Sequence, residues 1–173
     1  KNPKCTSCPW QNYCSAYLFY DPNDFPVKEL KKQVPKHLIG LGIVINSSGY
    51  VLIAQRLNNS SMGGMWEFPG GKHEDGESIK ETIAREINEE LSIKVRASEK
   101  LIDLDHAYSH KKLHFEVYLC ELISGTPQAL ASQQVRWVKP CDLNNYPFPK
   151  ANKAIIIALQ EYLSTHTNYK KLN

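Results

Sequence analysis

The sequence predicts an α/β fold, an α/β/α sandwich built on a mixed β-sheet. Runs rich in β-branched and aliphatic residues lie on both sides of one central helical pattern, and a second helical pattern lies near the C-terminus. The chain of 173 residues suffices for one ordinary domain and an appendage, and its net charge of +3 does not by itself indicate a nucleic-acid partner. No apolar run approaches the roughly 20 residues that span a bilayer, and no signal peptide is visible. We therefore expect a cytoplasmic protein without a membrane partner.

The first fourteen residues contain Cys5, Cys8 and Cys14 in the spacing C-x2-C-x5-C. An odd total of five cysteines fits a reducing cytoplasm with a metal-type cluster better than a disulfide framework. Zinc and four-iron clusters need four ligands, so three thiolates form an incomplete set, and plain surface thiols are the alternative. Cys120 and Cys141 are expected in the core or on the surface.

Residues 21–36 mix prolines with lysines and predict a semi-stiff, solvated linker. Strand patterns then begin around the turn Asn46–Gly49, and residues 62–65, with two glycines, form a loop. A final helix is expected over about 150–163. The expected strands cover residues 38–46, 50–56, 66–68, 93–97, 100–106, 113–122 and 135–138.

The central helix is expected from about Glu77 to Leu91. Ile79, Ile83, Ile87 and Leu91 recur at every fourth position and form an apolar stripe that faces a core. A glycine pair precedes this segment and can bring bare backbone close to a phosphate or a metal.

Three carboxylates lie beside this stripe. Glu86, Glu89 and Glu90 are spaced i, i+3 and i+4, so they converge on one side of the helix. Like charges repel at this spacing unless a cation joins them, and hard oxygen ligands suit Mg²⁺ or Mn²⁺. Arg85 could hold one carboxylate with a forked hydrogen bond. The alternative is a glutamate-rich helix with a solvated face.

The segment from Gly71 to Ile93 resembles the Nudix hydrolase signature G-x5-E-x7-R-E-U-x-E-E-x-G-U, in which U is aliphatic. Matching positions are Gly71, Glu77, Arg85, Glu86, Ile87, Glu89, Glu90 and Ile93. Ser92 departs from the pattern, because the family has a glycine there, at a helix exit where positive φ is often needed.

The resemblance implies Mg²⁺- or Mn²⁺-dependent hydrolysis of a nucleoside diphosphate linked to another group. It implies that Glu86, Glu89 and Glu90 bind the metal together with the Gly70 carbonyl. Glu77 and Arg85 would support this set and complete the catalytic residues, and Lys72 would touch phosphate.

The segments WEFPGGK (66–72) and FPKAN (148–152) resemble MutT-type 8-oxo-dGTP pyrophosphatases. This resemblance implies that Asn152 binds the oxidised base and Arg56 the substrate. The alternatives are a local backbone bond at a helix start for Asn152 and a surface ion pair for Arg56. MutT-type proteins also carry a glutamate in the loop before the last strand, where this chain has Ala131, Gln133 and Gln134. A glutamine can orient water but cannot take its proton.

The segment KNPKCTSCPWQNYC resembles the end of the iron–sulfur loop of MutY-type adenine DNA glycosylases. Tyr108, Ser109 and His110 resemble the Phe-Ser-His loop with which that family probes 8-oxoguanine opposite adenine in DNA. The alternative is an ordinary hairpin turn rich in His and Ser, without a binding role. The chain begins with Lys1, not Met, and we expect a piece of a longer or processed protein. Residues 1–20 would be the remnant of a glycosylase domain, 21–36 a linker, 37–165 a MutT-like Nudix domain and 166–173 a tail.

These patterns support three hypotheses. The chain hydrolyses 8-oxo-dGTP to 8-oxo-dGMP and pyrophosphate; or it reads 8-oxoguanine·adenine DNA for a glycosylase whose full-length form alone would hold a [4Fe-4S] cluster on Cys5, Cys8 and Cys14. A Nudix hydrolase with another substrate is the third, since the signature specifies the diphosphate and not the base.

Overall fold

The computed structural model describes residues 3–25, 35–107 and 112–166. The chain divides into two compact units, Lys1–Gln33 and Val34–Asn173, which are described separately. The division falls within the linker predicted over residues 21–36.

The N-terminal unit consists of short helical turns without a core. They are η1 (Cys5–Ser7), η2 (Gln11–Tyr13), α1 (Ser15–Phe19) and η3 (Pro22–Asp24). No residue from 3 to 25 is buried, and Trp10, Tyr13 and Phe19 are each more than two-thirds exposed. The turn η3 lies where only a linker was predicted, and it forms because the Asp21 carboxylate accepts a hydrogen bond from the Asn23 N–H and caps it.

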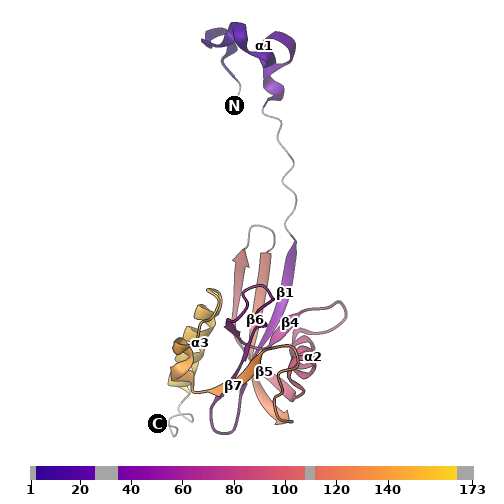
Figure 1. Ribbon diagram of the computed structural model, residues 1–173, viewed down its shortest axis with the longest axis vertical. Helices are drawn as coiled ribbons and strands as arrows, with labels where there is room; N and C mark the ends of the chain where they lie inside the picture. Colours follow the sequence, from indigo (N-terminus) through magenta and orange to yellow (C-terminus); the bar gives the residue numbers. More distant parts are fainter. Residues whose placement is uncertain (1–2, 26–34, 108–111, 167–173) are drawn as a thin grey trace. The chain divides into compact units, whose positions relative to one another are not determined.

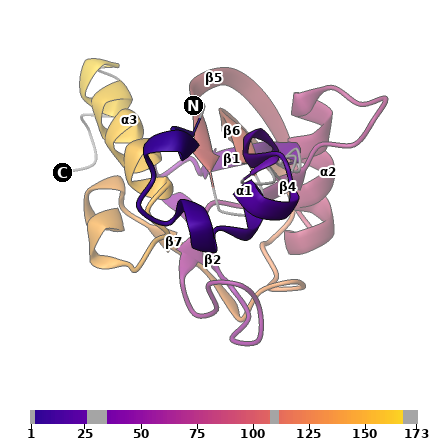
Figure 2. The ribbon, with the colours of Figure 1, turned by 90° about the horizontal axis from the view of Figure 1, so that it is seen from above.

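The second unit is a mixed β-sheet with a helix on each face, as predicted. Its sheet has the strand order β3-β2-β1-β6-β5, with β4 paired to β1 and β7 to β2. β1 runs parallel to β6, whereas the other pairs are antiparallel. In Figures 1 and 2, α2 and α3 lie on opposite sides of the sheet. The elements are β1 (Lys36–Ile45), β2 (Val51–Gln55), β3 (Trp66–Glu67), β4 (Gly70–Lys72), α2 (Ile79–Leu91), β5 (Lys94–Ala107), β6 (Lys112–Ser124), β7 (Gln134–Val138), η4 (Pro140–Asn145) and α3 (Asn152–Thr165).

Each face of the sheet has its own hydrophobic core. On the α3 side, Ile155 and Leu159 pack with inward-facing strand residues such as Ile43 and Val117. On the α2 side, the predicted stripe of Ile83, Ile87 and Leu91 is fully buried. Alternate residues of β1 and β6 thus enter opposite cores, which is the pattern of a sheet covered on both faces.

Two glycines in β1 let α2 approach the sheet closely. A Cβ at Gly40 would lie 2.8 Å from Cγ1 of Ile83, and one at Gly42 would lie 2.6 Å from Cδ1 of Ile87. Because these distances are shorter than carbon–carbon contact, side chains at both positions would push the helix away.

Three elements differ from the sequence expectation. The helix α2 begins at Ile79, because the Ser78 side chain accepts a hydrogen bond from the Glu81 N–H and forms a capping box that excludes Glu77 from the helix. The strands expected at 93–97 and 100–106 are one strand, β5, in which register shifts absorb the irregular segment. The glycine pair forms a strand, β4, because β1 offers it a partner edge.

The cysteines expected in the core or on the surface divide accordingly: Cys120 is buried and Cys141 exposed. Burial raises the pKa of Cys120 to about 12. Within the part of the chain that the structure describes, no helix is long and apolar enough to cross a membrane.

Ser92 adopts the left-handed conformation for which the signature has a glycine. It ends α2 with φ 54° and ψ 34°, and its N–H donates to the carbonyl of Asn88. A side chain in this conformation clashes with its own backbone, whereas glycine adopts it freely. The helix exit is therefore built with strain that the family's glycine avoids.

We predict that Ser92→Gly raises the free energy of unfolding by about 0.5–1 kcal/mol, because it relieves this strain. Urea unfolding followed by circular dichroism measures the change. Ser164→Gly is the matched control inside α3, where the same exchange should destabilise by roughly 0.5 kcal/mol. A loss of stability in Ser92→Gly would contradict the prediction.

Candidate active site

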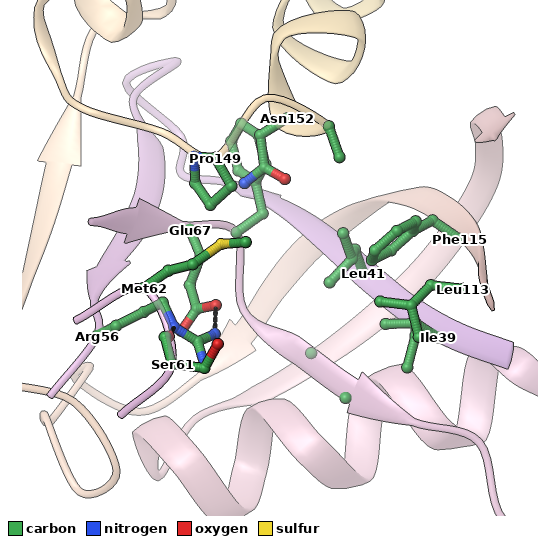
Figure 3. A pocket seen from close by; sticks show the side chains of 14 residues that line it. Ile39, Leu41, Arg56, Ser61, Met62, Glu67, Leu113, Phe115, Pro149 and Asn152 are labelled. Carbon is green, nitrogen blue, oxygen red and sulfur yellow. Dashed lines mark hydrogen bonds and ion pairs between the residues drawn. The ribbon is translucent and has the colours of Figure 1, made fainter. Parts of the chain in front are cut away.

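A pocket of about 290 Å³ opens beside the glycine pair of β4. In Figure 3, Ile39, Leu41 and Phe115 form an apolar wall on one side, and Arg56 and Met62 lie on the other. Asn152 and Pro149 close the pocket from the α3 side. An apolar cavity with a few polar groups at its rim is the usual form of a small-molecule site.

Two carboxylates of α2 contact the bare backbone of Gly70 and Gly71, which border this pocket. A Cβ at Gly71 would lie 2.2 Å from Cδ of Glu86, so the Glu86 carboxyl occupies the space that a side chain would fill. The Gly70 N–H donates a long hydrogen bond of 3.5 Å to Oε2 of Glu90. The glycine pair is thus required for close approach, and two predicted ligands lie against the edge of the pocket.

Arg85 organises the acidic side chains, as the sequence suggested. Its Nε and Nη2 donate to the two oxygens of Glu77, at 3.1 and 2.9 Å. Its Nη1 donates to Glu86 at 3.1 Å and to Glu89 at 3.4 Å. One guanidinium therefore ties Glu77, outside the helix, to two carboxylates on it. The hydrogen bonds to Glu77, followed by the one to Glu86, raise the already high pKa of Arg85.

Glu77 has further partners that fix it. Its Oε1 accepts from the Thr82 hydroxyl at 2.7 Å and from the Glu74 N–H at 2.9 Å. His73 lies 2.9 Å from the same hydroxyl through Nδ1. The hydrogen bonds from Arg85, then those from Thr82 and Glu74, lower the pKa of Glu77 to about 2.

Glu90 is a half-buried carboxylate of the site. Its burial, followed by the negative charges of Glu67 and Glu86, raises its pKa to about 7, against the opposing effects of the Gly70 N–H and Arg56. The ionised form of Glu90 is therefore disfavoured by its surroundings, and a divalent cation bound here would favour it.

The predicted metal ligands are not gathered as a complete set. Across residues 3–25, 35–107 and 112–166, no three His, Cys, Asp or Glu side chains form a group that could hold a metal ion. Glu89 is 58 % exposed and turned toward Arg85, whereas Glu86 and Glu90 face the glycine pair. Their hard oxygen donors and the excess negative charge fit Mg²⁺ or Mn²⁺. Cys5, Cys8 and Cys14 are free thiols, and among the described residues they do not form a group that could hold a metal ion.

The predicted substrate residues divide between the pocket and its surroundings. Arg56 lines the pocket, where its guanidinium pairs with Glu67 through Nη1 and donates to the Ser61 carbonyl at 2.7 Å through Nε. Arg56 thus makes the ion pair that was expected as the alternative to a substrate contact. This ion pair lies in the pocket lining. Lys72 is exposed on β4 and borders a separate surface depression with Lys36.

Asn152 lies in the pocket wall and is 6 % exposed. It is the first residue of α3, and its backbone N–H donates to the Pro149 carbonyl at 3.0 Å. Figure 3 shows its side-chain amide pointing into the pocket. Among the described residues, this amide is not one of the fully buried side-chain groups that lack a partner, so it can offer both a donor and an acceptor to a molecule in the pocket.

Glu67 is a site residue that the sequence reasoning missed. It follows buried Trp66 and precedes buried Phe68, so this alternation was the available signal for a side chain on the opposite side from the core. Burial raises the pKa of Glu67, and Arg56 partly opposes this effect. Tyr108, Ser109 and His110 lie outside the described residues.

Comparison with known proteins identifies the family and the fold of the second unit. Residues 40–158 match the NUDIX domain family. The CTP pyrophosphohydrolase of Escherichia coli K12 is 32% identical over 115 residues, covering 66% of this chain and 85% of the relative. The 8-oxo-dGTP diphosphatase of the same organism is 30% identical over 122 residues, covering 70% and 95%. The solution structure of the E. coli ORF135 protein superposes with a TM-score of 0.68 at 27% identity, covering 78% of this chain and 96% of that one.

We predict that Glu77 makes the stability of the second unit sensitive to acid. Its folded-state pKa is depressed to about 2, so its contribution is present above the unfolded pKa of about 4.3 and is lost as pH falls toward the folded value. Between pH 5 and 3, the urea midpoint should fall more steeply in the wild type than in Glu77→Gln. Glu99→Gln removes a carboxylate outside the network and should keep the wild-type slope. Equal slopes in wild type and Glu77→Gln would rule out this role.

Proposed function

Since the chain belongs to the NUDIX domain family, we propose that it is a nucleoside triphosphate pyrophosphohydrolase that prefers 8-oxo-dGTP and releases 8-oxo-dGMP and pyrophosphate. One observation carries the proposal. The Asn152 amide points into the pocket, and the glycine pair that contacts Glu86 and Glu90 borders the same pocket. A base and a phosphate chain can therefore be held together in one site.

The apolar wall of Ile39, Leu41 and Phe115 would contact the faces of the base, and the Asn152 amide would bond to its edge. Amides suit an oxidised purine, whose altered edge presents both a donor and an acceptor. The relative named for 8-oxo-dGTP supports this substrate, whereas the relative named for CTP supports a pyrimidine. The two relatives therefore agree on hydrolysis of a nucleotide and differ in the base, so the choice of base is the part of the proposal that needs its own test.

Phosphates would lie over Gly70 and Gly71, where no side chain blocks their approach. Mg²⁺ or Mn²⁺ held by Glu86, Glu89, Glu90 and the Gly70 carbonyl would neutralise phosphate oxygens and lower the pKa of a bound water. Arg85 and Glu77 keep the carboxylates oriented, and a carboxylate of α2 would accept the proton of the attacking water.

The deciding measurement is pyrophosphate release by the purified chain with Mg²⁺, with 8-oxo-dGTP, dGTP and CTP as substrates. We expect the oxidised nucleotide to be preferred. Faster release from CTP would assign a pyrimidine substrate and retain the hydrolase. If none of the three released pyrophosphate, the hydrolase proposal would be wrong.

Glu86→Gln and Glu90→Gln should each lower kcat by about 100-fold or more, because each removes a charge at the reacting phosphate. Glu81→Gln is the control on the same helix, since glutamine preserves the capping box. Near-normal rates in both variants would contradict the assignment of these carboxylates.

A second proposal concerns the N-terminal unit. We propose that the chain is part of an adenine DNA glycosylase and helps it to recognise 8-oxoguanine opposite adenine. The cysteine spacing supports this role, as does a unit whose described residues are nowhere buried and which needs a larger folded partner to cover its aromatic side chains.

The glycosylase role predicts that the chain binds a duplex with 8-oxoguanine·adenine more tightly than one with guanine·adenine. Alanine at both Ser109 and His110 should reduce this preference, whereas alanine at Ser47 and Ser48, on the β1–β2 turn, should not. Fluorescence anisotropy at fixed salt measures both affinities. Equal affinity of the wild type for the two duplexes would exclude the role.

A further inference from the structure

The loop between β2 and β3 forms one wall of the pocket. We call residues 57–64 the pocket loop; it contributes Ser61 and Met62 to the lining, and Arg56 immediately precedes it. Met62 has a φ of 57°, which is uncommon for a residue with a side chain. A segment in this conformation persists only where surrounding contacts hold it.

The side chain of Gln133, which is distant in the sequence, bonds to the start of the pocket loop. Nε2 of Gln133 donates to the carbonyl of Arg56 at 2.7 Å and to Oδ1 of Asn58 at 2.9 Å. The Gln133 N–H donates to the Gln55 carbonyl at 2.8 Å, which fixes the position of its own backbone. The Arg56 carbonyl also accepts from the Gly64 N–H at 3.1 Å, so Gln133 acts where the loop closes on itself.

A second amide chain runs beside the first. Nε2 of Gln134 donates to Oε1 of Gln55 at 2.6 Å, and Nε2 of Gln55 donates to the Gly64 carbonyl at 2.8 Å. Gln133, just before β7, and Gln134, its first residue, are thus joined to both ends of the pocket loop, the latter through Gln55. All these bonds require an amide donor, and a carboxylate at position 133 would instead face two acceptor oxygens.

We propose that Gln133 is a positioning residue, which holds the pocket loop in its substrate-binding form and thereby sets the affinity for the base. The inference rests on the proposed function, because the loop affects turnover only if the pocket binds the nucleotide. Gln133 acts through Arg56 and Asn58 and has no part in the chemical step. Substrate binding benefits because the free protein already holds the loop, and less ordering remains when the ligand arrives.

Gln133→Glu tests the inference, because it keeps the shape and removes the donor. For the preferred nucleotide in the substrate panel, we expect KM to rise about three- to tenfold and kcat to stay within about twofold, the pattern of lost binding that is not specific to the transition state. Gln160→Glu is the matched control: Nε2 of Gln160 donates to the Pro140 carbonyl at 3.1 Å, away from the pocket, and the variant should keep the wild-type KM. A raised kcat in Gln133→Glu would mean that a carboxylate here joins the chemistry, and an unchanged KM would also overturn the inference.

A second measurement keeps the test independent of turnover. The Gly64 amide hydrogen should exchange at least about fivefold faster in Gln133→Glu than in the wild type, since its acceptor would no longer be held. Unchanged exchange overturns the inference. If the wild type hydrolyses nothing but Gly64 exchange rises, the hydrolase proposal fails while the loop-positioning role of Gln133 stands.

Discussion

The close contact between α2 and β1 is the constraint on which the rest of the second unit depends. Gly40 and Gly42 leave room for Ile83 and Ile87, so the helix lies directly on the sheet. The same contact sets the height of Glu86 over Gly71. A site that must place carboxylates within reach of a phosphate tolerates little displacement, and close packing of the helix provides that accuracy. Hydrophobic burial on one side of α2 thereby positions the charged groups on the other.

The charges of the site balance in two separate groups. Arg85 neutralises the outer group, where Glu77 and Glu89 lie, whereas Arg56 pairs with Glu67 at the opposite rim of the pocket. Among the described residues, Glu90 accepts a long hydrogen bond from the Gly70 N–H, and its burial and the charges of Glu67 and Glu86 outweigh the effect of Arg56 and raise its pKa. The structure therefore disfavours the ionised form of Glu90 at the place where a polyphosphate with its cation would lie, and that cation would favour it. An arrangement that merely stabilised the fold would instead pair each carboxylate.

The two units raise different questions about function. The second unit contains a pocket, a polar group aimed into it and an acidic edge, which together suffice for a hydrolase hypothesis. The N-terminal unit has exposed aromatic side chains and three free thiols among its described residues, and its role is a separate proposal. Hydrolysis of a free nucleotide and recognition of the same lesion in DNA are compatible, because both depend on an oxidised guanine.

The sequence determined the features that depend on local spacing. A four-residue apolar period requires one buried face of α2, and the i, i+3, i+4 spacing places Glu86, Glu89 and Glu90 on neighbouring positions of that helix. The mixed sheet followed from strand patterns on both sides of the helix. The positive φ at Ser92 was also predictable, because a signature glycine marks a helix exit.

Only the tertiary structure decided which of these groups meet. It turned Glu89 toward Arg85 and solvent, added Glu67 to the acidic site, and pointed the Asn152 amide into the pocket. It also brought Gln133 to Arg56 across 77 positions of the chain. Such contacts depend on the strand order and on the close packing of α2 against β1. Both result from interactions between residues that are distant in the sequence. Local periodicity carries no information about them, since the partners lie on separate elements whose mutual distance is set by both cores together.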